Sequence, residues 1–135
     1  MREVLLLGNP IIWWTGALAL VAALVAWFVR RDWRWGVPVA GVLASWLPWF
    51  RFDDRPIFSF YAVTMIPFTI IAITLVVHSL AQAAQTPRHR YVVALLAGAF
   101  LVVVVVTFWY FHPIYTDDLI SYDAWRNRMW FNRWI

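Results

Sequence analysis

Long apolar stretches separated by short charged clusters are the main pattern along this chain. Four stretches stand out, at about 11–29, 35–50, 57–80 and 91–111. About 20 helical residues, rising about 1.5 Å each, cross a hydrocarbon core of roughly 30 Å. The first, third and fourth stretches reach this length. The second is marginal and needs a thinner bilayer or anchoring by its flanking tryptophans. The pattern predicts four membrane-spanning helices, because a backbone in lipid must satisfy its own hydrogen bonds.

The predicted fold class is therefore all-α, a polytopic membrane helical bundle. We expect residues 1–135 to form one membrane domain of four transmembrane helices. The chain 112–135 would be a tail that carries a short interfacial C-terminal helix. Pro67 stands near the middle of the third stretch, and a proline inside a helix lacks the N–H of one backbone bond. Its position predicts a kink in that helix.

The tail combines charged and aromatic residues. Ser121 is a suitable N-cap for a short helix. Tyr122, Trp125 and Met129 recur at helical spacing, while Trp130 points elsewhere. An aromatic surface almost all round suits a helix wedged against other helices better than one lying alone on lipid. We interpret the tail as a clamp at the membrane interface.

Composition supports a membrane protein and excludes several other classes. The chain is 64% hydrophobic and 13% charged, and its 11 tryptophans suit the membrane–water interface. There is no cysteine, which excludes a disulfide framework and a thiolate metal site. The net charge of +4 is too scattered for a nucleic-acid partner. No zinc-ligand spacing, phosphate loop or catalytic triad appears, so we expect no metal and no cofactor.

Arginine placement predicts the orientation. If all four stretches cross, the loops 30–34 and 81–90 share one side, with five arginines and one acid. The N-terminus, the loop 51–56 and the tail share the other side, with six arginines and six acids. Counted near the spans, the first side is richer in arginine and should be cytoplasmic. Both termini would then be extracytoplasmic.

The polar residues of the outward side are the candidates for chemistry. In "RFDDRP", Arg51 and Arg55 flank Asp53 and Asp54. These charges can pair with one another at headgroup level, or an arginine can bind a phosphate through its planar fork. His112 follows the fourth stretch, where a histidine can transfer protons or simply cap a helix end. We treat His112 as possible polar support.

Three segments resemble one family in the same order. They are "LLLGNPIIWW" at 5–14, "RPIFSFYAVTMIPF" at 55–68 and "HPIYTDDLISYDAWRNRMWFNRWI" at 112–135. They look like the C-terminal four-helix membrane region of actinobacterial-type protein O-mannosyltransferases, a family of the glycosyltransferase C superfamily. The resemblance covers essentially the whole chain.

The resemblance implies a bacterial plasma-membrane enzyme that transfers mannose from polyprenyl-phosphate-mannose to Ser or Thr of secreted proteins. The family's catalytic carboxylates belong to its first external loop, and no aspartate of this chain maps onto them. We therefore name no catalytic residue, and expect the chain to be inactive without a separate catalytic N-terminal part. A gene fragment, a split-gene half and a remnant all fit.

Two hypotheses follow for the function. In the first, the chain is the membrane portion of such an enzyme, and Arg51, Arg55 and Arg126 steer the lipid-linked phosphate. In the alternative, it is a non-catalytic small membrane protein that acts as an accessory or packing subunit.

Overall fold

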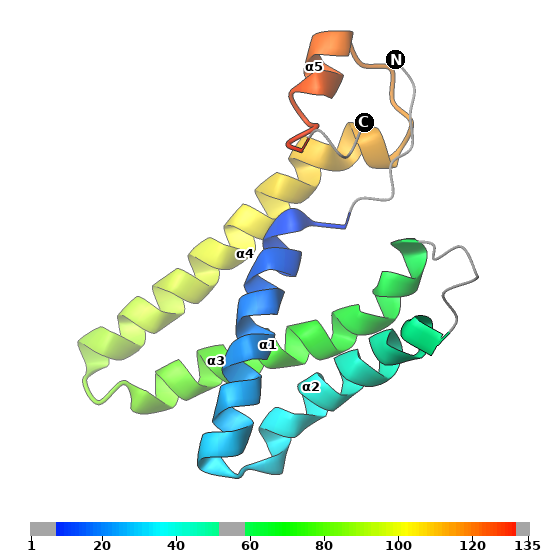
Figure 1. The fold of residues 1–135 in the computed structure, drawn as a ribbon. Helices are drawn as coiled ribbons and strands as arrows, with labels where there is room; N and C mark the ends of the chain where they lie inside the picture. Colours follow the sequence, from blue (N-terminus) through cyan, green and yellow to red (C-terminus); the bar gives the residue numbers. More distant parts are fainter. Residues whose placement is uncertain (1–7, 52–58, 132–135) are drawn as a thin grey trace.

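A computed structural model describes residues 8–51 and 59–131 of the chain (Figure 1). All regular structure in these two ranges is helical, so the predicted all-α class is confirmed. The elements, in chain order, are α1 (Pro10–Arg30), α2 (Trp33–Trp46), the 3₁₀ helices η1 (Leu47–Arg51) and η2 (Ser59–Met65), α3 (Ile66–Ala83), α4 (Pro87–Tyr115) and α5 (Tyr122–Arg126).

Three helical stretches of the described chain are long and apolar enough to cross a membrane. They are Pro10–Arg30, Ala62–Ala83 and Pro87–Tyr115. The second apolar stretch is different, because α2 has only 14 residues and ends at Trp46. Pro48 explains this end, since it has no N–H to donate to the carbonyl of Ala44. α2 supplies about 21 Å of rise and η1 about 10 Å more, so a fourth crossing through both stays a prediction.

Local sequence determines where α1 begins and ends. The Oδ1 atom of Asn9 accepts hydrogen bonds from the N–H groups of Ile11 (3.0 Å) and Ile12 (3.4 Å), and Pro10 occupies the first turn. This is a side-chain N-cap followed by the proline that a first turn tolerates. Arg31 ends the helix in a left-handed conformation, with φ of 53°.

Pro67 does not lie near the middle of an α-helix, where the sequence predicts a kink. Pro67 lies in the first turn of α3, and the preceding residues Ser59–Met65 form the 3₁₀ helix η2. A first-turn N–H has no helical partner in any case, so proline costs little there. Pro67 therefore lies where the 3₁₀ helix η2 passes into α3, and the helical stretch changes direction at this junction (Figure 1).

The main core lies where α1, α2 and α3 pack together. Most of its side chains are small or medium-sized, and one is a tryptophan: Ala19, Ala23, Trp35, Val39, Ala72 and Ile73. α1 and α3 approach closely at Gly16, where an added Cβ would collide with the Thr69 side chain. Small residues at helix contacts allow such approach, which is how helices associate in lipid.

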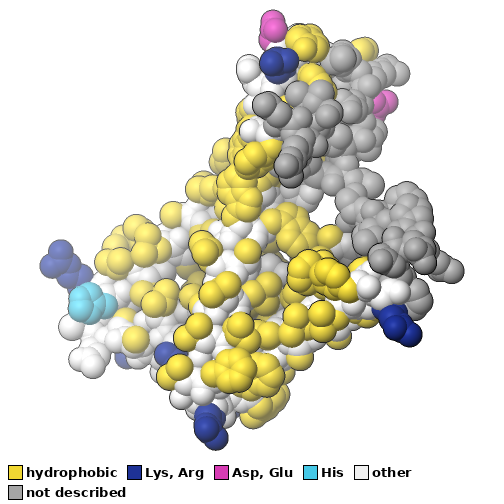
Figure 2. Space-filling view, viewed as in Figure 1, with side chains coloured by type: hydrophobic (Ala, Val, Ile, Leu, Met, Phe, Trp, Pro, Cys, Tyr) yellow, Lys and Arg dark blue, Asp and Glu magenta, His cyan; other side chains and the backbone are white. Residues whose placement is uncertain are grey.

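The helix α4 stands apart from this core along much of its length (Figure 1). Only 6% of its most apolar window is buried, against 17% for α1. Asn9 ties the two helices together, because its Nδ2 donates to the carbonyl of Val104 at 2.9 Å. Figure 2 shows hydrophobic side chains over the middle of the helices and most charged ones near their ends. An apolar belt of this kind suits lipid.

Candidate functional site

The tail folds back onto the end of α4. Asp117 adopts a left-handed conformation with φ of 58° just after α4 ends. Ser121 then caps α5, since its Oγ accepts from the N–H of Ala124 at 3.2 Å, as the sequence predicts. Trp125 and Met129 are buried against Phe111 and Ile114 of α4. The second core cluster consists of Phe111, Ile114, Trp125 and Met129.

Arg128 holds the tail against the end of α4, and it is not among the candidates that the sequence predicts. Its Nε donates to the carbonyl of Tyr110 at 2.7 Å, and its Nη1 donates to the carbonyl of Ala124 at 2.6 Å. Its guanidinium also lies 4.8 Å from the centroid of the Tyr110 ring. The Tyr110 hydroxyl in turn donates to the carbonyl of Asn127 at 2.9 Å. We call Tyr110, Asn127 and Arg128 the tail clasp.

Aromatic contacts join the tail clasp to the start of α1. Trp14 lies 6.1 Å from Trp130 and 6.0 Å from Phe131, measured between ring centroids. Trp130 also meets Phe111 of α4 edge to face, at 4.9 Å. The start of α1, the end of α4 and the tail therefore form one aromatic assembly. The role of the tail as a clamp at the membrane interface stays a prediction.

Arg126 is exposed beside this assembly. Its Nη1 donates to the hydroxyl of Tyr122 at 3.3 Å, the one side-chain hydrogen bond it makes within the described chain. No acidic group among those residues lies within 4 Å of its guanidinium. Most of its donors are therefore open to a ligand that approaches this end of the molecule.

His112 lies in the last turn of α4. Its ring stacks on Trp109, with centroids 5.2 Å apart. Its Nδ1 is 3.5 Å from the Thr116 hydroxyl and 3.8 Å from Asp118 Oδ2. The Thr116 hydroxyl donates to the same Asp118 oxygen at 2.9 Å. These three residues form a small polar cluster at the base of the tail.

The structure does not bring Arg51 next to Arg126. Arg51 is exposed at the end of η1, and Figure 1 shows this end well away from α5. Arg55, Asp53 and Asp54 lie outside the described residues. Both interpretations of these charges, pairing with one another and binding of a phosphate by an arginine, therefore stay predictions. Within 8–51 and 59–131 no three His, Cys, Asp or Glu residues gather as metal ligands.

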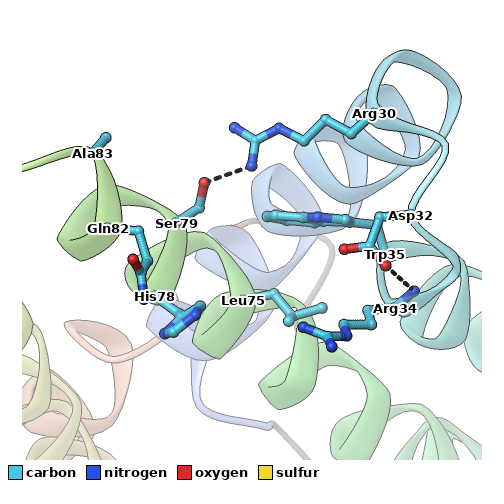
Figure 3. Close-up of a pocket in the computed structure, with 9 residues that line it drawn as sticks. All are labelled: Arg30, Asp32, Arg34, Trp35, Leu75, His78, Ser79, Gln82 and Ala83. Atoms are coloured by element: carbon cyan, nitrogen blue, oxygen red, sulfur yellow. Dashed lines mark hydrogen bonds between the residues drawn. The ribbon is translucent and has the colours of Figure 1, made fainter.

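A polar pocket of about 400 Å³ lies at the opposite end of the bundle (Figure 3). Arg30 at the end of α1 donates from Nη1 to the Ser79 hydroxyl of α3 at 3.0 Å. Its guanidinium lies 5.5 Å from the centroid of the Trp35 ring. The lining consists of Arg30, Asp32, Arg34, Trp35, Leu75, His78, Ser79, Gln82 and Ala83. The predicted site residues contribute nothing to it.

A second, apolar groove of about 610 Å³ lies between α1, α3 and α4. Leu18 of α1, Ile73 of α3 and Phe100 of α4 are among its walls. Its lining includes Thr15, the residue that follows the tail-contacting Trp14 in the sequence. An apolar groove of this kind, closed on three sides by membrane helices, suits a hydrocarbon chain.

Comparison with known proteins gives the family. Residues 1–134 match the family described as the C-terminal four TMM region of protein-O-mannosyltransferase. The chain belongs to this family. A polyprenol-phosphate-mannose–protein mannosyltransferase of Mycobacterium tuberculosis is 36% identical over 135 residues, which is 99% of this chain and 26% of that protein. The Mycolicibacterium smegmatis relative is also 36% identical, and the Corynebacterium glutamicum relative is 31% identical, each with 26% of its length covered.

The predicted resemblance to actinobacterial protein O-mannosyltransferases is thus confirmed. The predictions that the chain is a membrane protein and that its family is one of glycosyltransferases are confirmed as well. The mannosyltransferase-family chain spans about a quarter of the length of the curated relatives it matches. No solved structure matches it.

The structure explains two of the segments that carry the resemblance to the mannosyltransferase family. The "GNP" of 8–10 caps α1 and, through Asn9, ties it to α4. The closing segment builds the tail clasp and buries Trp125. Most of the middle segment, 55–68, precedes α3 and lies partly outside the described residues.

Proposed function

We propose that this chain is the C-terminal membrane portion of a protein O-mannosyltransferase that uses polyprenyl-phosphate-mannose as donor and Ser or Thr hydroxyls of secreted proteins as acceptors. The match over residues 1–134 carries this proposal. The names of the mycobacterial and corynebacterial relatives support the donor. The catalytic carboxylates would come from residues outside this chain.

The lipid-linked phosphate is proposed to arrive at the tail end. Arg126 supports this, because its guanidinium is exposed and makes only the 3.3 Å bond to Tyr122. A guanidinium fork matches the geometry of a phosphate. Arg51 and Arg55 remain candidates for the same role, and His112 remains a candidate for polar support. Because Arg51 lies apart from α5, Arg126 is the stronger candidate in this chain.

The apolar groove supports a place for the prenyl chain. Its lining includes Thr15, which follows Trp14 in α1, and Trp14 contacts Trp130 in the tail. A donor whose phosphate meets Arg126 could therefore extend its chain between α1, α3 and α4. This arrangement would use the part of α4 that the main core leaves open.

We place the protein in the bacterial cell membrane as a multi-pass domain, with both termini on the extracytoplasmic face. The arginine distribution supports this orientation, since loops 30–34 and 81–90 carry more arginine than acid. Cysteine accessibility tests it. A cysteine at Ser121 should react with a membrane-impermeant maleimide in intact cells, and one at Gln85 should react only after lysis. The reverse pattern would refute the orientation.

Mannosyl transfer tests the function. The purified chain alone should transfer no mannose from polyprenyl-phosphate-mannose to a Ser/Thr peptide. A chimera should be active when the chain replaces the matching last quarter of the Mycolicibacterium smegmatis relative. Transfer by the chain alone would overturn the need for a separate catalytic part. A folded chimera without activity would favour the alternative, an accessory or packing subunit.

A further inference from the structure

The pocket between the end of α1, the start of α2 and the end of α3 concentrates positive charge outside the proposed donor site. Two arginines, Arg30 and Arg34, line it together with His78. Asp32 is the one acid in the lining, and its Oδ1 accepts the backbone N–H of Arg34 at 3.0 Å as the cap of α2. Neither guanidinium has a carboxylate within 4 Å in the described parts of the chain. The pocket therefore holds more positive charge than its own acid neutralises.

The polar groups that line this pocket come from different helices (Figure 3). Arg30 extends from α1 toward α3, where its Nη1 bonds the Ser79 hydroxyl at 3.0 Å. The hydroxyl of Ser79 and the amide of Gln82 add neutral groups on the same wall. The guanidinium of Arg34 makes no hydrogen bond with the described residues. Arginine forks with a hydroxyl and an amide are typical donors to phosphate oxygens.

The pocket also lies at the depth where lipid headgroups are expected. It sits at the ends of α1 and α3, two of the helices able to cross a membrane. Trp35 lines it, and two tryptophans near the same ends of α1 and α2 are exposed, Trp27 at 37% and Trp33 at 71%. Tryptophan gathers at the membrane–water interface, so these rings mark that level.

We propose that the Arg30–Arg34 pocket binds a phosphate group, supplied by the headgroup of an anionic phospholipid in the leaflet opposite the tail. Arg30 and Arg34 hold the phosphate oxygens, and Ser79 orients Arg30. Basic residues at a membrane surface attract anionic lipids. This pocket is separate from the tail end, so its occupant is not the mannose donor of the proposed function.

Lipid binding to the purified chain tests this proposal. Native mass spectrometry of the chain released from detergent compares how many phosphatidylglycerol and phosphatidylcholine molecules stay bound. In a second measurement, inorganic phosphate is titrated as a soluble competitor. We expect preferential retention of phosphatidylglycerol, weakened about tenfold or more by the double change Arg30→Gln and Arg34→Gln. The single change Arg34→Gln removes no internal hydrogen bond, so it tests the pocket even if the double variant folds poorly.

The matched control removes the same charge at the same end of the bundle. Arg31→Gln with Arg88→Gln alters two exposed arginines that do not line the pocket. Unchanged phosphatidylglycerol retention in this control supports a built site. Equal losses in both double variants would overturn the proposal, because diffuse surface charge would explain them.

Inorganic phosphate separates the two sources of the ligand. If phosphate binds with the same arginine dependence while both lipids are retained equally, the pocket is a phosphate site and the lipid headgroup is refuted. If neither lipid nor phosphate responds to Arg34→Gln, the whole proposal fails.

Discussion

Replacing Arg128 by alanine should release the tail from α4. The change removes two hydrogen bonds from a charged donor, to the carbonyls of Tyr110 (2.7 Å) and Ala124 (2.6 Å). It also removes the cation–π contact with Tyr110. Hydrogen bonds from a charged group contribute about 1.5–3 kcal/mol each, and such a ring contact about 0.5–1 kcal/mol. Because Arg128 is only half-buried, we expect a loss of about 2–3 kcal/mol in the local free energy of tail opening.

Hydrogen exchange measures this local opening. The amide of Met129 donates to the carbonyl of Arg126, and that of Asn127 to Asp123, both at 3.0 Å. In Arg128→Ala a peptide covering 119–131 should exchange about 30- to 140-fold faster, since about 1.4 kcal/mol is a factor of ten. Peptides from α1 should be unaffected.

Arg126→Ala is the matched control. It removes one exposed 3.3 Å hydrogen bond to Tyr122, so exchange of the tail should rise by less than about threefold. Equal acceleration in both variants would refute the assignment of the clasp to Arg128. Unchanged exchange in Arg128→Ala would refute it as well.

Three further outcomes follow from single contacts. Asn9→Ala should lower the free energy of unfolding by about 1–2 kcal/mol, because it removes the cap of α1 and the hydrogen bond to Val104. Unfolding titrations in detergent measure this loss, and an unchanged unfolding midpoint would contradict the cap. Gly16→Val should lower it by about 1–3 kcal/mol, since the new side chain collides with Thr69, whereas Gly98→Ala meets nothing within 4 Å and should not destabilise. Equal effects of the two glycine changes would contradict the α1–α3 contact.

The sequence was sufficient for features that depend on a few neighbouring residues. Apolar runs and their lengths predict helices because the lipid leaves the backbone no other hydrogen-bond partner. Ser121 as the cap of α5 is local in the same sense, since its bond reaches only to Ala124. The family resemblance is similarly carried by short ordered motifs.

Other features required the tertiary arrangement. Pro67 reads as a helix interruption until the start of α3 is known. The clasp of Arg128 depends on the reversal at Asp117, and the Asn9 tie spans 95 residues. Nothing in the local pattern near Arg30 indicates Ser79 as its partner, 49 residues away. Contacts of this range are set by helix packing, which apolar periodicity does not encode.

The donor dependence of mannosyl transfer tests the central claim most directly. In the active chimera with the Mycolicibacterium smegmatis relative, Arg126→Ala should raise the KM for polyprenyl-phosphate-mannose by about tenfold, the effect of one lost charge-assisted contact. The KM for the acceptor peptide should stay unchanged. Arg88→Ala, at the opposite end of the bundle, should leave both constants as they are. An unchanged donor KM in Arg126→Ala, or an equal rise in Arg88→Ala, would contradict the arrival of the lipid phosphate at the tail.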